Sequence, residues 1–139
     1  MIEGTIVVID LDDFSNVVKE RGWSEYRPND ATARLTELVE DLLRKHQAFL
    51  VWGLDEERGT EEAVIEVPFK EPEELEDDLK KIEEEMRRLG VGVTAVAVKG
   101  FLLLKKARDR REAYYATPDR RRAKRILERI KRSKKTNNT

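Results

Sequence analysis

The apolar residues of this chain follow two patterns that alternate along it. Runs of four to eight mostly apolar residues are typical of strands, and they lie at residues 5–10, 48–52, 63–69 and 91–98. Apolar residues that recur every three to four positions are typical of amphipathic helices, and they lie at residues 31–43 and 72–89. A short helical turn is expected at residues 14–21, and the glycine-flanked segment 53–60 is expected to form a hairpin loop.

The order strand, helix, strand, strand, helix, strand is that of a ferredoxin-like βαββαβ domain. We therefore predict an α+β fold, with a ferredoxin-like domain over residues 1–100. Residues 101–132 are expected to add a basic helical extension that starts at the Leu102–Leu104 run, with a second helix after Pro118. Residues 133–139 are expected to be a disordered tail.

Composition narrows the possible chemistry. The chain has no cysteine and a single histidine, His46, so a metal would have to be held by oxygen ligands, as Mg, Mn or Ca are. No apolar run is long enough to span a membrane and no secretory signal is visible, which favours a cytoplasmic protein. Charged residues make up 41% of the chain, a composition that favours a thermophilic source.

The net charge of −1 conceals two oppositely charged parts. Residues 1–100 hold 13 basic and 25 acidic side chains, a net of −12, whereas residues 101–139 hold 15 and 4, a net of +11. The basic segment either pairs with the acidic part of the same or another copy, or binds phosphate. Both interpretations stay open at the level of sequence.

The first predicted strand ends in three carboxylates, Asp10, Asp12 and Asp13. So much negative charge beside a core needs a divalent cation, a cluster of Arg and Lys, or a helix N-terminus to neutralise it. Right-handed crossovers place the end of this strand beside the hairpin at 53–60, which carries Asp55 and Glu56. The two acidic groups are then expected to share one edge of the sheet and to hold Mg²⁺ or Mn²⁺.

Simpler interpretations of both groups remain. Asp12 or Asp13 is also suited to capping a helix that starts near Phe14. Residues 55–59 also have the composition of a solvated turn.

Residues 9–14 (IDLDDF) and 52–56 (WGLDE) resemble the two motifs of the palm-domain superfamily. That superfamily includes GGDEF diguanylate cyclases, nucleotidyl cyclases, CRISPR-associated polymerase palms and archaeal GTP cyclohydrolase III. The resemblance implies a palm fold over roughly residues 5–99, an archaeal source, and a homodimer, because the GTP cyclohydrolase III-like proteins resemble two fused palms. Leu54 stands where the motif has its second glycine, and Val18 stands where it has a guanine-reading asparagine.

By this resemblance the metal ligands would be Asp10, the Leu11 carbonyl and a hairpin carboxylate, with Asp12 beside them. The hairpin carboxylate would be Asp55 or Glu56. Phe14 would pack beneath the site, with Asn16 as the nearest amide and Gly53 as the glycine of the turn. A late basic residue, Arg121 or Lys124, would meet the triphosphate.

The resemblance implies a Mg²⁺-dependent, nucleoside triphosphate-binding domain, either a nucleotidyl cyclase or a GTP-hydrolysing enzyme. The alternative is a non-catalytic ferredoxin-like module that binds nucleic acid or a protein partner through residues 101–135. The basic composition of that segment supports the alternative. A homo-oligomer is expected in the first case.

Overall fold

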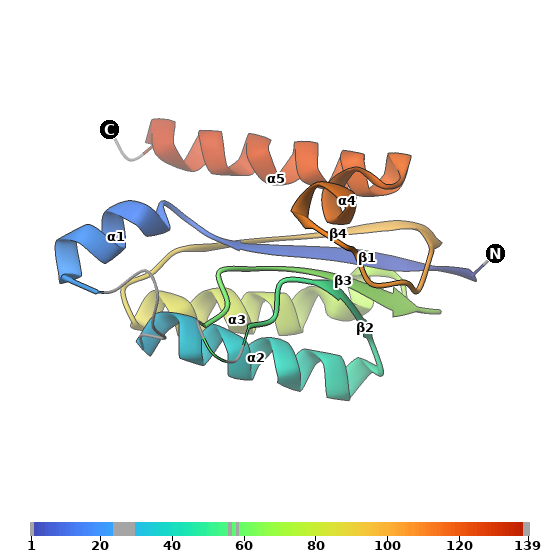
Figure 1. Ribbon diagram of the computed structural model, residues 1–139, viewed down its shortest axis with the longest axis horizontal. Coiled ribbons are helices and arrows are strands. Elements are labelled where there is room, and N and C mark those ends of the chain that lie inside the picture. Colours follow the sequence, from blue (N-terminus) through green and yellow to red (C-terminus); the bar gives the residue numbers. More distant parts are fainter. Residues whose placement is uncertain (1, 24–29, 56, 58, 138–139) are drawn as a thin grey trace.

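A computed structural model describes residues 2–23, 30–55, 57 and 59–137. It is an α+β structure with one four-stranded antiparallel sheet and helices on both of its faces (Figure 1). In chain order the elements are β1 (Ile2–Leu11), α1 (Phe14–Arg21), α2 (Asp30–His46), β2 (Phe49–Trp52), β3 (Glu62–Pro68), the 3₁₀ turn η1 (Pro72–Leu75), α3 (Glu76–Arg88), β4 (Val93–Leu102), α4 (Arg110–Tyr115) and α5 (Pro118–Asn137).

The strands are ordered β2-β3-β1-β4, and every neighbouring pair is antiparallel. This arrangement is compatible with the ferredoxin-like fold expected from the sequence. The central strand β1 pairs with β3 from Gly4↔Pro68 to Asp10↔Glu62 and with β4 from Ile2↔Leu102 to Leu11↔Val93. The acidic end of β1 therefore lies between the start of β3 and the start of β4.

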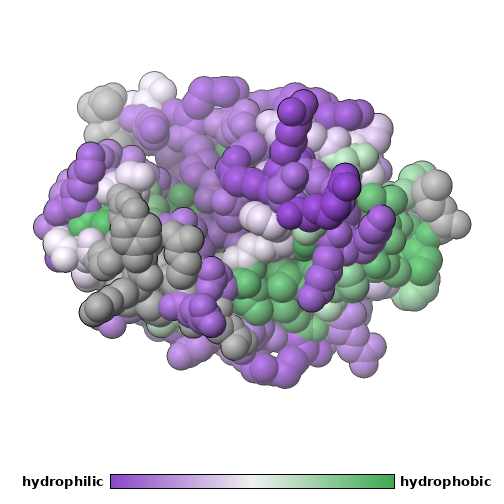
Figure 2. All heavy atoms as spheres, in the orientation of Figure 1, coloured by the Kyte–Doolittle hydropathy of each residue, from purple (hydrophilic) through white to green (hydrophobic). Residues whose placement is uncertain are grey.

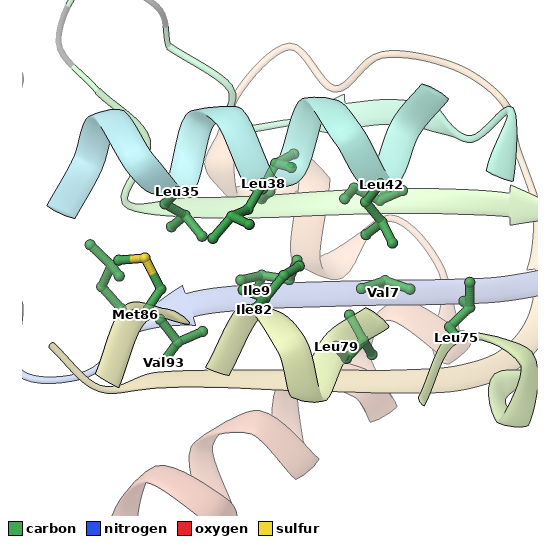
Figure 3. Packing of buried hydrophobic residues seen from close by; sticks show 14 of the residues in the cluster. Val7, Ile9, Leu35, Leu38, Leu42, Leu75, Leu79, Ile82, Met86 and Val93 are labelled. Atoms are coloured by element: carbon green, nitrogen blue, oxygen red, sulfur yellow. The ribbon is translucent and has the colours of Figure 1, made fainter. Parts of the chain in front are cut away.

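Helices α2 and α3 cover one face of the sheet. Their inward stripes, which include Leu35 and Leu38 of α2 and Ile82 and Met86 of α3, pack on Val7, Ile9 and Val93 (Figure 3). All of these side chains are buried. Their burial follows from the three-to-four-residue spacing in the sequence, because that spacing places apolar side chains on one side of a helix.

Helices α4 and α5 cover the opposite face. Tyr114 of α4 and Ala123 and Leu127 of α5 pack on Ile6 and Val8 of β1, which alternate with the residues that face α2 and α3. Residues 6–9 of β1 are therefore buried on both faces of the sheet. The extension thus supplies the second half of the core.

One ion pair is buried within this second half. Glu66 of β3 and Arg120 of α5 are 0% and 2% exposed, and Arg120 Nη2 lies 3.1 Å from Glu66 Oε2. The same carboxylate accepts hydrogen bonds from the backbone N–H groups of Leu103 (2.9 Å) and Leu104 (2.6 Å). Glu66 therefore ties the chain after β4, as well as α5, to the middle of the sheet.

Two expectations about the extension were wrong. The Leu102–Leu104 run starts no helix: β4 continues to Leu102 because it pairs with a longer β1 as far as Ile2, and the next helix begins at Arg110. The tail expected at 133–139 is helical over residues 133–137, because α5 extends along the sheet and its last turns contact the acidic end of β1. Within the described residues, no helix is long and apolar enough to cross a membrane.

Candidate functional site

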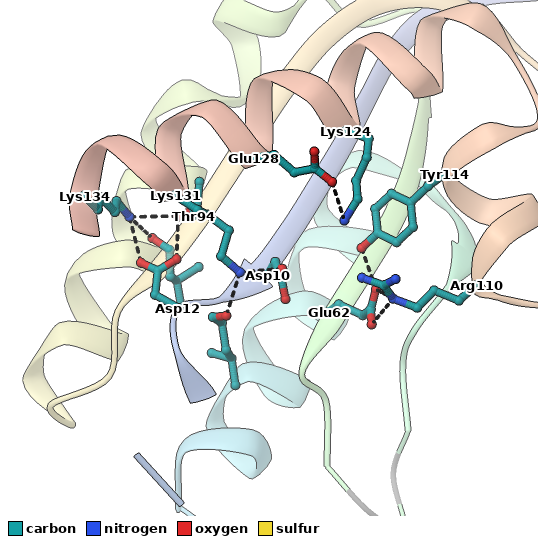
Figure 4. A network of polar contacts seen from close by, with 12 residues as sticks. Asp10, Asp12, Glu62, Thr94, Arg110, Tyr114, Lys124, Glu128, Lys131 and Lys134 are labelled. Carbon is teal, nitrogen blue, oxygen red and sulfur yellow. Dashed lines mark hydrogen bonds and ion pairs between the residues drawn. The ribbon is translucent and has the colours of Figure 1, made fainter. Parts of the chain in front are cut away.

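The candidate site lies at the rim of the sheet where β1 ends. Asp10 faces Glu62 across the β1–β3 pair and Thr94 across the β1–β4 pair. The C-terminal half of α5 passes over this rim and brings two lysines to it, Lys131 and Lys134 (Figure 4). The site therefore combines residues from both ends of the chain.

Lys131 neutralises the end of β1. Its ammonium group donates to Asp10 Oδ2 at 2.6 Å and to the Leu11 carbonyl oxygen at 3.0 Å. Burial raises the pKa of the Asp10 carboxyl, and the charge of Glu62 adds to that effect, while the Lys131 hydrogen bond opposes it. A cation thus occupies the two oxygen positions for which the sequence predicted a metal.

Lys134 neutralises Asp12, the next carboxylate along the rim. Its ammonium group donates to Asp12 Oδ2, to the Val93 carbonyl and to Thr94 Oγ1, each at 2.9 Å. Thr94 Oγ1 in turn donates to Asp12 Oδ1 at 2.6 Å. Each of the two carboxylates therefore has its own lysine partner on α5.

Glu62 belongs to a third charged group beside Asp10. Tyr114 donates its hydroxyl to Glu62 Oε1 at 2.6 Å, and Arg110 Nε lies 2.9 Å from both Glu62 oxygens. Burial, followed by the contact with Glu62, raises the pKa of the Tyr114 hydroxyl, which therefore stays a donor. Lys124 lies over the Tyr114 ring, 4.4 Å from its centroid (Figure 4).

Sequence reasoning missed Glu62, Lys131 and Lys134. The detectable signal was the spacing of α5: the sheet-facing stripe that contains Leu127 continues through positions 131 and 134, at the same alternation of four and three residues. A lysine on such a stripe lies where a core residue is expected, and its charge must meet a carboxylate there. Glu62, the first residue of β3, lies outside the hairpin segment 53–60 in which Asp55 and Glu56 are the expected acids.

The structure brings together only part of the predicted ligand set. Asp10, Leu11 and Asp12 share the rim, as expected. The carboxylate that the sheet register places beside Asp10 is Glu62. Asp55 lies in the loop after β2, where its side chain accepts a hydrogen bond from the Glu57 backbone N–H at 3.0 Å, and Glu56 lies outside the described residues.

The predicted helix cap also differs from the expectation. Asp13 occupies the N-cap position of α1, but its side chain accepts from Asn16 Nδ2 at 2.9 Å and makes no hydrogen bond to the helix backbone. Phe14 is the first residue of α1 and packs against the core formed with α2 and α3. Asn16 is therefore held by Asp13 in this structure.

The remaining predicted nucleotide-binding residues lie on two elements: Lys124 and Arg121 on α5, and Gly53 directly after β2. Lys124 is 8% exposed and pairs with Glu128 at 3.5 Å, whereas Arg121 is exposed and donates to the Tyr115 carbonyl. Gly53 has a φ of +110°, and a Cβ at this position would lie 2.0 Å from the Glu62 carbonyl oxygen, so a side chain there would clash with β3.

A hollow of about 400 Å³ lies beside the rim and is lined in part by Gly53, Trp52, Leu54 and Glu62. A volume of this size is within the range of small-molecule sites. Because Glu62 also faces Asp10, the hollow and the charged rim are contiguous.

The oxygen atoms at the rim suit a hard cation. Asp10 and Glu62 supply two carboxylates on neighbouring strands, and Leu11 supplies a carbonyl. Among the described residues no group of three or more His, Cys, Asp or Glu side chains gathers at one point. Mg²⁺ does not need such a group of three side chains, because it commonly binds through one or two carboxylates together with substrate phosphates. The chain matches no protein-family model and no curated protein.

Proposed function

We propose that this protein is a palm-type domain that binds a nucleoside triphosphate with Mg²⁺ at the rim formed by β1, β3 and α5. Asp10, Glu62 and the Leu11 carbonyl would hold the metal. Lys131 and Lys134 would bind phosphate oxygens, and the hollow beside Glu62 would receive the nucleoside.

The observation that carries the proposal is the position of the Lys131 ammonium group. It binds both Asp10 Oδ2 and the Leu11 carbonyl oxygen, so these two atoms are already arranged around a cation. A divalent ion has twice the charge of an ammonium group and prefers the same oxygen ligands. It gains a third oxygen donor from Glu62, which stands opposite Asp10.

The lysines are suited to a second set of partners. When a divalent cation binds Asp10, the Lys131 ammonium loses its carboxylate and needs another anion within reach of its flexible side chain. A triphosphate that shares the metal supplies that anion at the same place. Lys134, 41% exposed and one turn further along α5, reaches the next phosphate by the same argument.

A bound Mg²⁺ would neutralise phosphate charge and favour phosphoryl or nucleotidyl transfer. This is the chemistry of a nucleotidyl cyclase or a GTP-hydrolysing enzyme. The residues of this chain orient the phosphates in the proposal: Lys131 and Lys134 from one side, and the β1 rim from the other. Tyr114 and Arg110 fix the Glu62 carboxylate through hydrogen bonds.

The test is calorimetric titration of the protein with ATP and with GTP, each with Mg²⁺ and with EDTA. We expect binding that requires Mg²⁺ and falls at least tenfold in Asp10→Asn and in Glu62→Gln. The matched control is Asp13→Asn, which removes a neighbouring carboxylate that contacts Asn16 and neither lysine. Binding that persists in EDTA, or equal affinity in wild type and Asp10→Asn, would overturn the proposal. Product analysis then identifies any turnover.

A further inference from the structure

Helix α5 carries a second set of cations on the side opposite the sheet. Arg121, Arg125, Arg129, Arg132 and Lys135 are all exposed. Arg125, Arg129 and Arg132 follow one another at four and three residues, which places them on one side of the helix. With Arg121 and Lys135 at its ends, this outer stripe extends over roughly 21 Å at 1.5 Å per residue.

The central part of the outer stripe lacks acidic partners. In the described part of the chain no carboxylate pairs with Arg125, Arg129, Arg132 or Lys135, whereas the cations of α2 pair with Glu37, Glu40, Asp41, Asp78 and Glu85. The two acids of α5 itself are already used, Asp119 by Arg122 and Glu128 by Lys124. Among the residues that the structure describes, these four cations thus have no ion-pair partner, and their mutual repulsion is a cost that a polyanion would remove.

The rest of the molecule would direct a polyanion to this face. Residues 1–100 have a net charge of −12, and the surface of η1 and α3 is acidic, with Glu73, Glu76 and Glu83 beside one groove. Hydrophilic residues cover the part of the surface where α5 lies in Figure 1 (Figure 2). Most of these stripe residues are arginines, whose planar forked donors fit phosphate oxygens.

An exposed aromatic side chain lies at the start of the stripe. Tyr115 is 47% exposed, and Arg121 donates to its backbone carbonyl, so the two residues are neighbours. An exposed aromatic ring beside a track of cations is the arrangement that binds single-stranded nucleic acid, in which bases stack on the ring while the backbone follows the charges. A duplex, whose bases are already stacked, gains nothing from the ring.

We infer that the outer stripe of α5, with Tyr115, binds single-stranded nucleic acid. Phosphates lie along Arg125, Arg129, Arg132 and Lys135, and one base stacks on Tyr115. This inference goes beyond the proposed nucleotide site and does not depend on it, because Arg125, Arg129 and Arg132 lie on the side of the helix away from Lys131 and Lys134.

The test is fluorescence anisotropy of the full chain with labelled 12-nucleotide U and dT oligomers. With about four phosphate contacts, affinity should fall roughly 50-fold between 50 and 200 mM salt. The triple variant Arg125→Gln/Arg129→Gln/Arg132→Gln should lose most of the affinity and flatten the salt dependence. Tyr115→Ala should lose about tenfold in affinity while the salt dependence is unchanged, since the variant loses one stacked base and no phosphate contact. Lys45→Gln/Lys80→Gln, which removes two cations from the acidic side, is the matched control and should bind normally.

Three outcomes would overturn the inference. The first is no binding at 50 mM salt, and the second is equal binding by the triple variant. The third is stronger binding of a duplex or of polyglutamate than of the single strand, because duplex DNA or an acidic protein would then be the better occupant. Circular dichroism confirms that the variants are folded; all of the substituted stripe side chains are exposed.

Discussion

The two faces of the sheet are covered by helices that are held in different ways. Helices α2 and α3 attach through an apolar interface of leucine, isoleucine and methionine (Figure 3). Helix α5 attaches through a smaller apolar stripe together with charged contacts at both ends: Arg120 with Glu66 near its start, and Lys131 and Lys134 with Asp10 and Asp12 near its end. The contact of α2 and α3 with the sheet is apolar, and charged pairs join these two helices to each other, as between Lys45 and Asp78. The contact of α5 with the sheet depends on charge as well as on burial.

The difference matters because charged contacts specify position more strictly than apolar ones. An apolar stripe tolerates small shifts of a helix, whereas a buried arginine or a lysine with several acceptors fits in one place. The charged contacts of α5 also allow exchange of cations, since another cation can replace a lysine on a carboxylate. The face that carries the candidate function is therefore the one whose attachment responds to ions.

The largest expected loss of stability follows from breaking the buried pair. Glu66→Gln leaves Arg120 buried without a counter-charge and should lower the free energy of unfolding by about 3–5 kcal/mol. Urea denaturation measures this. The double variant Glu66→Gln/Arg120→Met should cost clearly less than the two single losses added together; additive losses would show that the two side chains are not coupled.

A core truncation on the other face should cost slightly less and should be insensitive to ions. Leu35→Ala removes a fully buried side chain of α2 and should cost about 2–4 kcal/mol. Its loss should be the same in 0.1 M and 1 M NaCl. A loss that changes markedly with salt would contradict the view that the contact between α2 and the sheet is apolar.

A smaller and salt-dependent loss is expected at the rim. Lys134→Met removes the ammonium group from Asp12, Val93 and Thr94 and should cost about 1 kcal/mol, since Lys134 is partly exposed. The loss should shrink in 1 M NaCl, as screening weakens the contact in the wild type. A loss independent of salt would mean that packing of the lysine stem, and not its charge, holds the end of α5.

The smallest changes in the free energy of unfolding are expected from pH. These changes have opposite signs for Asp78 on α3 and Asp10 at the rim. Burial is the largest single effect on the pKa of Asp78 and raises it, but the hydrogen bonds and charges of Lys45 and His46 of α2 together outweigh burial and lower that pKa. The contribution of ionised Asp78 to the stability of the fold is therefore complete above about pH 3.9 and is lost as pH falls below that value. Burial raises the pKa of Asp10, so its folded state holds the proton more tightly, and stability falls as pH rises above about 3.9.

Unfolding free energies of the wild type, Asp78→Asn and Asp10→Asn between pH 2.5 and 6, in EDTA, test both signs. The advantage of the wild type over Asp78→Asn should grow with rising pH. Its advantage over Asp10→Asn should decrease. Slopes of the same sign for both variants would show that Lys131 compensates the burial of Asp10 fully.

The sequence predicted the fold well because the fold depends on local patterns. The apolar runs and helical stripes are each read within one element, and the four strands and two covering helices follow from them. The site depends on contacts between distant residues: Lys131 and Asp10 are 121 residues apart. The sequence left open whether the basic extension pairs with the acidic part of the chain or binds phosphate. Which side chains meet, Lys131 with Asp10 and Lys134 with Asp12, depends on α5 lying across β1.

Two further differences have local causes. The start of the extension was misjudged because the Leu102–Leu104 run is equally apolar as strand or helix, and only its pairing with Ile2 decides. The turn between β2 and β3 is long, so that the residue opposite Asp10 in the sheet register is Glu62 at the start of β3. Asp55, expected beside Asp10, lines the same hollow as Glu62.

The most direct test of the central claim, that the Lys131 ammonium stands where a divalent cation binds, is a titration of Mn²⁺ into the protein without nucleotide, followed by electron paramagnetic resonance. Lys131→Met removes the competing cation and should bind Mn²⁺ at least tenfold more tightly than the wild type. Asp10→Asn/Lys131→Met should lose that gain, and Lys80→Met, whose lysine pairs with Glu76 on the other face, should behave as the wild type. Equal or weaker Mn²⁺ binding by Lys131→Met would contradict the claim and leave Lys131 as a purely structural clamp between α5 and β1.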